Sequence, residues 1–150
     1  MTRIVAFALL LSLAACTTTS TVRQPHAPVA GQAYSVAFVS NAGEDLAGIA
    51  GLVSVIRGRL RDAGMLATDA GPGPRVEVVL KHYYVRADMV RAVAGMLAGR
   101  DRIASQVTVL DGNGTRVGRF DVETTNLSAW GSREALMDRH ADEIVSRLRP

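Results

Sequence analysis

The chain has 150 residues, of which 48% are hydrophobic and 21% are charged, and its formal net charge is +3. This length suits one domain, and the composition is too apolar and too weakly charged for a disordered protein. The single cysteine, Cys16, excludes an intramolecular disulfide and any zinc site that is built on several cysteines.

An export signal precedes Cys16. Arg3 supplies a positive start, and residues 4–15 form an apolar stretch that ends in two small residues, Ala14 and Ala15. This stretch is shorter than the run of about 18 apolar residues that a spanning helix needs. We therefore expect residues 1–15 to be a signal peptide, whose removal takes away Arg3 and leaves a net charge of +2.

The four residues Leu13-Ala14-Ala15-Cys16 resemble the lipobox of bacterial lipoproteins. The resemblance implies that Cys16 carries a diacylglycerol thioether, that the signal is cut before it, and that the new amino group is acylated. Two or more acyl chains hold a protein firmly on a membrane. Thr17 follows, and in Gram-negative lipoproteins a residue other than Asp there implies the periplasmic face of the outer membrane. The alternative is an ordinary signal with a chance cysteine.

The basic residues do not indicate a nucleic-acid partner. They are almost all arginine, with Lys81 as the only lysine, and they are interleaved with acidic residues. A nucleic-acid interface would show a basic block or basic residues alternating with aromatic ones. We expect a mixed, solvated surface and no nucleic-acid partner.

Residues 17–33 are rich in Thr, Pro and small residues and show no apolar periodicity, which is typical of a linker. We expect residues 16–33 to be a flexible, lipid-anchored tether with a span of roughly 20–25 Å. His26 is then a solvated residue of this tether. The globular domain is expected over residues 34–150.

The domain begins with a strand and a long helix. Tyr34, Val36 and Phe38 alternate with small residues, which predicts a short strand. Residues 41–44 resemble a capping box and predict a helix N-terminus. An apolar stripe at intervals of three and four predicts a helix of some twenty residues that ends at Gly64. The stripe consists of Leu46, Ile49, Val53, Ile56, Leu60 and Ala63.

A Gly/Pro loop at residues 71–74 leads to the strongest strand pattern, at residues 75–86. Strict alternation places one set of side chains toward the core: Val76, Val78, Leu80, His82 and Tyr84. It places the other set on the opposite face: Glu77, Val79, Lys81, Tyr83 and Val85. Both faces are partly apolar, which predicts a central strand.

Two strands at residues 102–110 and 115–125 are predicted to form a hairpin around the Asp-Gly and Asn-Gly dipeptides of residues 111–114. Ser132 then caps a last helix. The buried stripe of this helix consists of Met137, Ala141, Ile144 and Leu148. The order β-α-β-β-β-α predicts an α+β fold with a single mixed four-stranded sheet, its first two strands parallel and both helices packed on one face.

This layout resembles a group of small bacterial envelope lipoproteins that are related in layout to transport-auxiliary and outer-membrane assembly lipoproteins. The resemblance rests on the lipobox, the Gly-rich residues 95–99, and residues 107–111 followed by Gly114. The pattern of the group names no catalytic residue, and it implies a binding or assembly role.

Two candidate sites carry competing interpretations. Asp111, Asn113 and Thr115 match the first three ligand positions of a calcium loop, but the twelfth position is Val122 where that loop needs Glu. A hairpin turn explains the same residues. His82 and His140 form a metal or proton-transfer pair if the last helix packs over the strand, but a satisfied core histidine is commoner. We expect no metal and no cofactor.

Residues 87–99 are the strongest candidate for a contact surface. Apolar and Met-rich side chains interrupt the series of strands there, which predicts either a local cover for the sheet or an exposed surface for a partner. Together with one residue of the preceding strand, the expected surface consists of Tyr83, Met89, Val93, Met96 and Leu97.

These features predict a non-enzymatic, lipid-anchored envelope protein that serves assembly or transport by binding another envelope protein. The alternative is a periplasmic binder of a small amphiphile or lipid, held between residues 87–99 and the sheet. The sequence is also compatible with a homo-oligomer. Of the functions considered, an enzyme has the least support.

Overall fold

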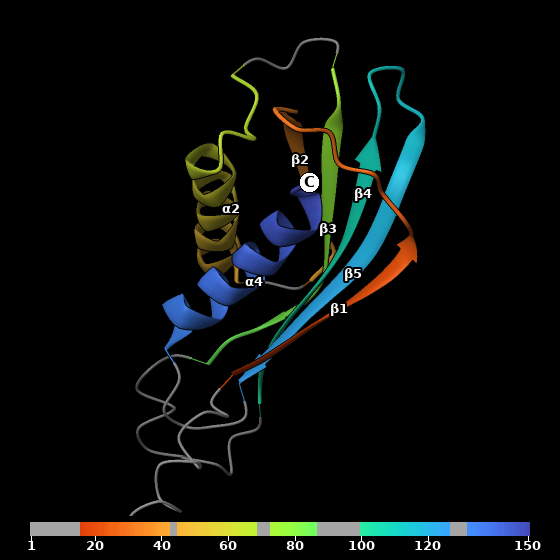
Figure 1. Ribbon diagram of the computed structural model, residues 1–150. Coiled ribbons are helices and arrows are strands. Elements are labelled where there is room, and N and C mark those ends of the chain that lie inside the picture. Colours follow the sequence, from red (N-terminus) through yellow and green to blue (C-terminus); the bar gives the residue numbers. More distant parts are fainter. Residues whose placement is uncertain (1–15, 43–44, 69–72, 87–99, 127–131) are drawn as a thin grey trace, which may run out of the picture.

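The computed structural model of the protein describes residues 16–42, 45–68, 73–86, 100–126 and 132–150. A twisted sheet lies against two helices, which both cover the same face (Figure 1). In chain order the elements are β1 (Cys16–Gln24), β2 (Ser35–Ser40), α2 (Leu46–Asp62), β3 (Arg75–Tyr84), β4 (Asp101–Leu110), β5 (Arg116–Asn126) and α4 (Arg133–Leu148).

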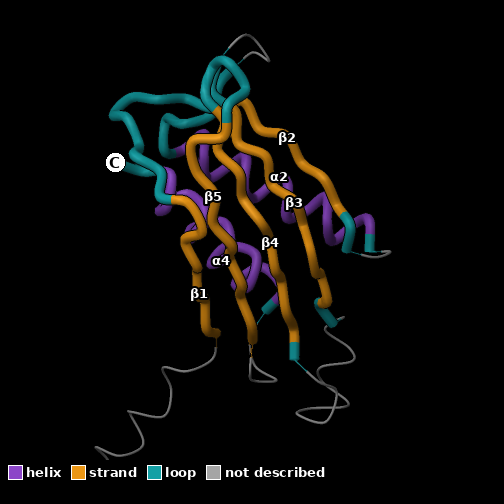
Figure 2. The backbone as a smooth tube through the Cα atoms, turned by 90° about the vertical axis from the view of Figure 1, so that its right-hand side faces the viewer, coloured by secondary structure: helices purple, strands orange, loops and turns teal. Residues whose placement is uncertain are grey.

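The sheet has five strands in the order β1-β5-β4-β3-β2. The pair β2 and β3 is parallel, and every other neighbouring pair is antiparallel. Figure 2 shows the five strands side by side, with the helices behind them. The α+β class, the mixed sheet and the β-α-β-β-β-α order from β2 onward agree with the prediction from sequence. The prediction of four strands is wrong.

The additional strand is β1, which covers the first half of the segment expected to be a flexible tether. It pairs antiparallel with β5 from Cys16 opposite Asn126 to Gln24 opposite Arg119. The side chain of Ser20 donates a hydrogen bond to Glu143 of α4, so β1 is also joined to the helical layer. The described part of the fold therefore begins with β1 at Cys16.

The second half of that segment is also packed. The imidazole of His26 lies 3.1 Å from the hydroxyl of Tyr34 and shares a hydrogen bond with it. Its backbone passes so close to β5 that a Cβ on Gly118 would lie 2.5 Å from the Cβ of His26. His26 is thus half-buried, and burial lowers its pKa.

Both helices begin at a side-chain cap. Asp45 accepts a hydrogen bond from the amide of Gly48, so α2 begins at Leu46, a few residues later than the predicted capping box. Ser132 accepts a hydrogen bond from the amide of Ala135, as the sequence predicts. Gly64 follows α2 with φ of 67°, a conformation that suits glycine.

The core lies between the helices and one face of the sheet. In α2 the buried side chains include Leu52 where the sequence predicts Val53, and Leu46 is 76% exposed. The predicted stripe of α4 is buried along its whole length. The helix side chains pack on inward-facing residues of the strands, which include Val76, Val78, Leu80, Ile103, Val107, Val109, Phe120 and Val122.

A β-bulge interrupts β3. Leu80 pairs with Ser105 and His82 pairs with Ala104, so Lys81 is an extra residue on the β3 side. Such an insertion reverses which residues face inward beyond it. Tyr83 therefore points to the helices, and His82 and Tyr84 point to the open face.

Candidate functional site

Cys16 lies at one end of the sheet. It is opposite Asn126, the last residue of β5, and Asn126 is opposite Asp101, the first residue of β4. Three neighbouring strands therefore begin or end in the same row as the predicted lipidation residue. Strands β1, β3, β4 and β5 run from this end toward the hairpin at residues 111–114 at the other end, whereas β2 pairs only with residues 75–80 of β3, nearer the hairpin (Figure 2).

Residues 87–99 lie outside the described residues, and with them four of the residues expected to form a partner surface: Met89, Val93, Met96 and Leu97. Two described residues mark where this segment leaves and rejoins the sheet. Arg86 and Asp101 form an ion pair with 2.9 Å between Nε and Oδ1, and their side chains are only 3% and 0% exposed. The amide of Arg86 donates to the same oxygen. This buried pair joins the two ends of the segment.

Tyr83, the fifth residue of the expected surface, is 7% exposed and belongs to the core. Val85 is also buried. Both were expected on the open face with Val79, and the bulge at Lys81 is the reason that they are not. Tyr84 takes the exposed position, with 49% of its surface accessible.

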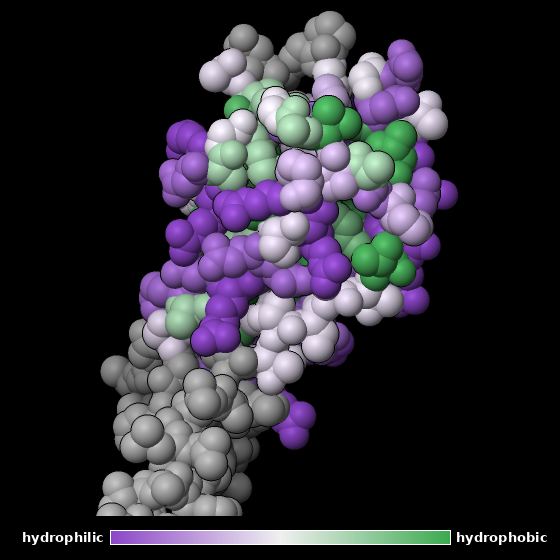
Figure 3. Space-filling model, in the orientation of Figure 1, coloured by the Kyte–Doolittle hydropathy of each residue, from purple (hydrophilic) through white to green (hydrophobic). Residues whose placement is uncertain are grey.

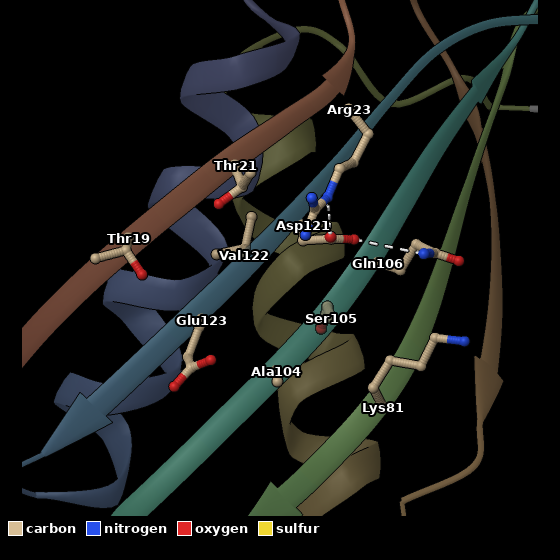
Figure 4. Close-up of a pocket in the computed structure, with 10 residues that line it drawn as sticks. All are labelled: Thr19, Thr21, Arg23, Lys81, Ala104, Ser105, Gln106, Asp121, Val122 and Glu123. Carbon is tan, nitrogen blue, oxygen red and sulfur yellow. Dashed lines mark hydrogen bonds and ion pairs between the residues drawn. The ribbon is translucent and has the colours of Figure 1, made fainter.

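The open face of the sheet carries a shallow depression of about 310 Å³, which is lined by residues of β1, β4 and β5 and by Lys81 of β3. Figure 4 shows Arg23, Gln106 and Asp121 turned toward one another above the strands. The Nε of Arg23 lies 2.8 Å from a carboxylate oxygen of Asp121, and the amide of Gln106 donates to the other at 3.4 Å. Thr19 and Thr21 lie along the β1 side of the depression.

A second pair continues this polar surface toward the Cys16 end, where Arg102 donates to Glu123 at 2.8 Å. Both side chains are nearly half exposed. Hydroxyls, an amide and mutually neutralised charges suit hydrogen bonding to a polar partner. Asp121 and Glu123 alternate along β5 with the buried Phe120 and Val122, and the sequence did not predict their arginine partners on other strands.

His82 and His140 lie on opposite faces of the sheet. His82 is exposed on the open face, and His140 of α4 is fully buried on the other. They therefore form no pair, and the interpretation of His82 and His140 as a metal-binding or proton-transfer pair is wrong. No cluster of three His, Cys, Asp or Glu side chains suited to a metal occurs among the residues that the structure describes.

His140 instead forms a buried hydrogen-bonded group with two hydroxyls. Its Nε2 lies 2.8 Å from Oγ of Ser105, and its Nδ1 lies 3.0 Å from Oγ1 of Thr124. A neutral imidazole has one donor and one acceptor nitrogen, and each hydroxyl is able to take the complementary role. Burial lowers the pKa of His140 to about 3, so the ring is neutral at physiological pH. The group is a structural element of the core.

Asp111 is used by its own turn. Its Oδ1 accepts hydrogen bonds from the amides of Asn113 and Thr115, both at 2.9 Å. Gly114 has φ of 80°, as the predicted hairpin requires. The geometry is that of a hairpin turn, which accounts for the residues that resemble a calcium loop.

Figure 3 views the molecule from the side, at right angles to the open face, and hydrophilic side chains predominate there, with separate groups of apolar side chains. Arg59 of α2 reaches Asp138 and Asp142 of α4 at 3.0 and 3.1 Å and joins the two helices. None of the helices formed by the described residues is long and apolar enough to cross a bilayer.

No protein-family model matches the chain, and no curated protein matches it. Solved structures do. A variant of PelC from Paraburkholderia phytofirmans, crystallised as a dodecamer, superposes with a TM-score of 0.61 at 14% sequence identity. The PelC dodecamer in a second crystal form gives 0.61 at 13% identity. Each match covers 89% of this chain and 97% of the other. At this identity the likeness shows that the chain has the PelC fold.

Proposed function

We propose that this protein is a lipid-anchored bacterial lipoprotein of the outer membrane, on its periplasmic face, and that it is a non-enzymatic assembly or transport accessory. The observation that carries the proposal is the position of Cys16. It ends a lipobox in the sequence and begins the first strand of the fold. Cleavage before Cys16 therefore leaves every described element of the domain in the mature chain.

We further propose that the mature protein forms a homo-oligomer through which it binds its envelope partner. PelC, which has the same fold, crystallises as a dodecamer. Strands β1 and β2 each end the sheet with one side that has no neighbouring strand among the described residues. Such edges favour contacts with another chain. The polar open face remains available for the partner.

Labelling with palmitate tests the anchor. We expect the native protein to incorporate palmitate and to fractionate with outer membranes, and Cys16→Ser to do neither. Thr17→Asp is the matched control: it keeps the cysteine and the label, and the lipobox resemblance predicts that it stays in the inner membrane. Palmitate incorporation by Cys16→Ser would refute lipidation at this residue.

Light scattering of the detergent-solubilised lipoprotein tests the oligomer. We expect a mass several times that of one chain, at the same value for the native protein and for Thr17→Asp. A monomer at micromolar concentration would contradict the oligomer and leave the lipid anchor unaffected.

A further inference from the structure

We propose that the Cys16 end of the sheet lies directly on the phospholipid surface, with Tyr84, Arg100 and Arg102 as the residues that contact the headgroups. The inference rests on the proposed lipidation of Cys16. It goes beyond that anchor because it assigns an orientation to the whole domain and a lipid-contacting surface to named residues.

The first step is the length of chain between lipid and fold. Cys16 is itself the first residue of β1, and Thr17 already pairs with Thr125 of β5. A flexible tether of 17 residues would allow the domain to stand roughly 20–25 Å from the anchor and to turn freely. With no residue between the anchor and the strand, the acyl chains hold this end of the sheet at the membrane.

The second step is what else lies at that end. Thr17, Thr125, Arg102 and Tyr84 follow one another across four neighbouring strands as directly paired residues. Strands are about 4.8 Å apart, so Tyr84 lies about 14 Å from Thr17 along this row. Arg100 immediately precedes β4 at the same end.

The third step is the chemistry of the row. Tyr84 and Arg100 are exposed, and Arg102 is exposed apart from its contact with Glu123. Tyrosine combines an apolar ring with a polar hydroxyl, and arginine combines an apolar stem with a cation that pairs with phosphate. Both are suited to the boundary between acyl chains and headgroups. Apposition to anionic lipid would add an attraction for the guanidinium of Arg100, while Glu123 already neutralises the charge of Arg102.

The opposite end of the sheet supplies an internal reference. Strand β4 has 10 residues, which at about 3.4 Å each place the hairpin about 30 Å from the Cys16 end. Asn113 lies at the tip of that hairpin and is exposed. If the Cys16 end rests on lipid, Asn113 lies far from it.

The test uses the full lipoprotein, in which the lipid occupies the only native cysteine and an introduced thiol is unique. Tyr84→Cys, Arg100→Cys and Asn113→Cys are labelled with a fluorophore and reconstituted in phosphatidylethanolamine–phosphatidylglycerol vesicles that carry nitroxide headgroups. We expect at least about twofold stronger quenching at positions 84 and 100 than at 113. If Tyr84→Cys does not unfold cooperatively and is therefore misfolded, Arg100→Cys replaces it in the comparison, because that substitution alters no described core contact.

A matched control lengthens the anchor. In this variant, fifteen Gly/Ser residues are inserted between Cys16 and Thr17. We expect the protein still to float with the vesicles, and the quenching at position 84 or 100 to fall to the level at position 113. Equal quenching at both ends without the insert, or no effect of the insert, would overturn the orientation. Loss of flotation together with absence of palmitate would instead refute the proposed anchor, so the two failures are distinguishable.

Discussion

At the scale of single residues, His140 makes the stability of the domain depend on pH. Its pKa is about 3 in the folded protein and about 6.5 when unfolded, so the unfolded chain binds more protons between these values. Stability is therefore complete above pH 6.5 and falls as the pH decreases toward 3. We expect the free energy of unfolding, measured with urea, to be about 2 kcal/mol lower at pH 5 than at pH 7.

His140→Gln is the control for this dependence, because the amide keeps one donor and one acceptor between Ser105 and Thr124 without titrating. The variant should be less stable than the native protein at pH 7 and show a much smaller change between pH 7 and pH 5. The same pH dependence in both proteins would assign the effect to other groups.

The ion pair of Arg86 and Asp101 leads to a second prediction at this scale. Removing one partner of a buried pair leaves the other charge without compensation in a poorly solvated site. We expect Asp101→Asn to reduce the free energy of unfolding by about 3 kcal/mol. Glu123→Gln, which breaks the exposed pair with Arg102, should reduce it by less than about 1 kcal/mol in the same urea titration. If both variants lose the same free energy of unfolding, burial of the Arg86–Asp101 pair does not increase its contribution to stability.

At the scale of elements, the sequence predicts the helices and strands whose order of apolar and polar residues reflects one buried face. The two strands of the predicted hairpin, the stripe of α4 and the turn at Asp111 all agree with the structure. Strand β1 has no such pattern, because it lies at the sheet edge and most of its residues are threonine or serine. Backbone pairing with β5 forms this strand, and composition alone does not reveal the partner.

The bulge in β3 shows a second limit. Alternation assigns faces correctly up to Leu80, and one additional residue then places Tyr83 in the core and Tyr84 outside. Nothing in the local sequence marks the insertion, since Lys81 and His82 are both compatible with an exposed position. The arginine–carboxylate pairs of the open face are missing from the sequence interpretation for a related reason: the partners come from different strands.

The packing of α2 on β3 produces a prediction at this scale. A Cβ on Gly48 would lie 2.5 Å from the hydroxyl and 2.8 Å from Cε1 of Tyr83, whose ring is buried. Gly48→Ala should therefore reduce the free energy of unfolding by about 1–3 kcal/mol, although alanine favours helix.

Gly58→Ala in the same helix is the matched control. No atom lies within 4 Å of its added Cβ, so the gain in helix propensity should appear as about 0.5–1 kcal/mol of added stability. Thermal and urea unfolding measure both variants. A stabilising Gly48→Ala would show that the Tyr83 ring moves aside at little cost.

At the scale of the whole molecule, the main change from the sequence-based interpretation is where the domain begins. The sequence predicts a tether up to residue 33 and a four-stranded domain from Tyr34, whereas the structure places Cys16, the residue that we propose to be lipidated, in the sheet itself. PelC shares this fold at 14% identity, so few specific side chains are needed to preserve it. In this chain both helices pack on one face of the sheet, and polar side chains line the depression on the other.

Two shortened chains test this boundary. A chain of residues 17–150 keeps β1, and a chain of residues 34–150 lacks it. Without β1, the edge of β5 is uncovered and Glu143 loses its hydrogen bond from Ser20. Cross-strand pairs contribute roughly 0.2–1 kcal/mol each, so we expect the shorter chain to be less stable by about 3 kcal/mol.

An uncovered strand edge also pairs with other chains, and gel filtration should show aggregation of the 34–150 chain at concentrations at which the 17–150 chain remains in its native association state. If both chains have the same stability, β1 is an attachment that the domain does not need. If the predicted loss is observed, β1 is an integral part of the sheet, and the lipid that we propose on Cys16 would be joined directly to the β1–β5 pair.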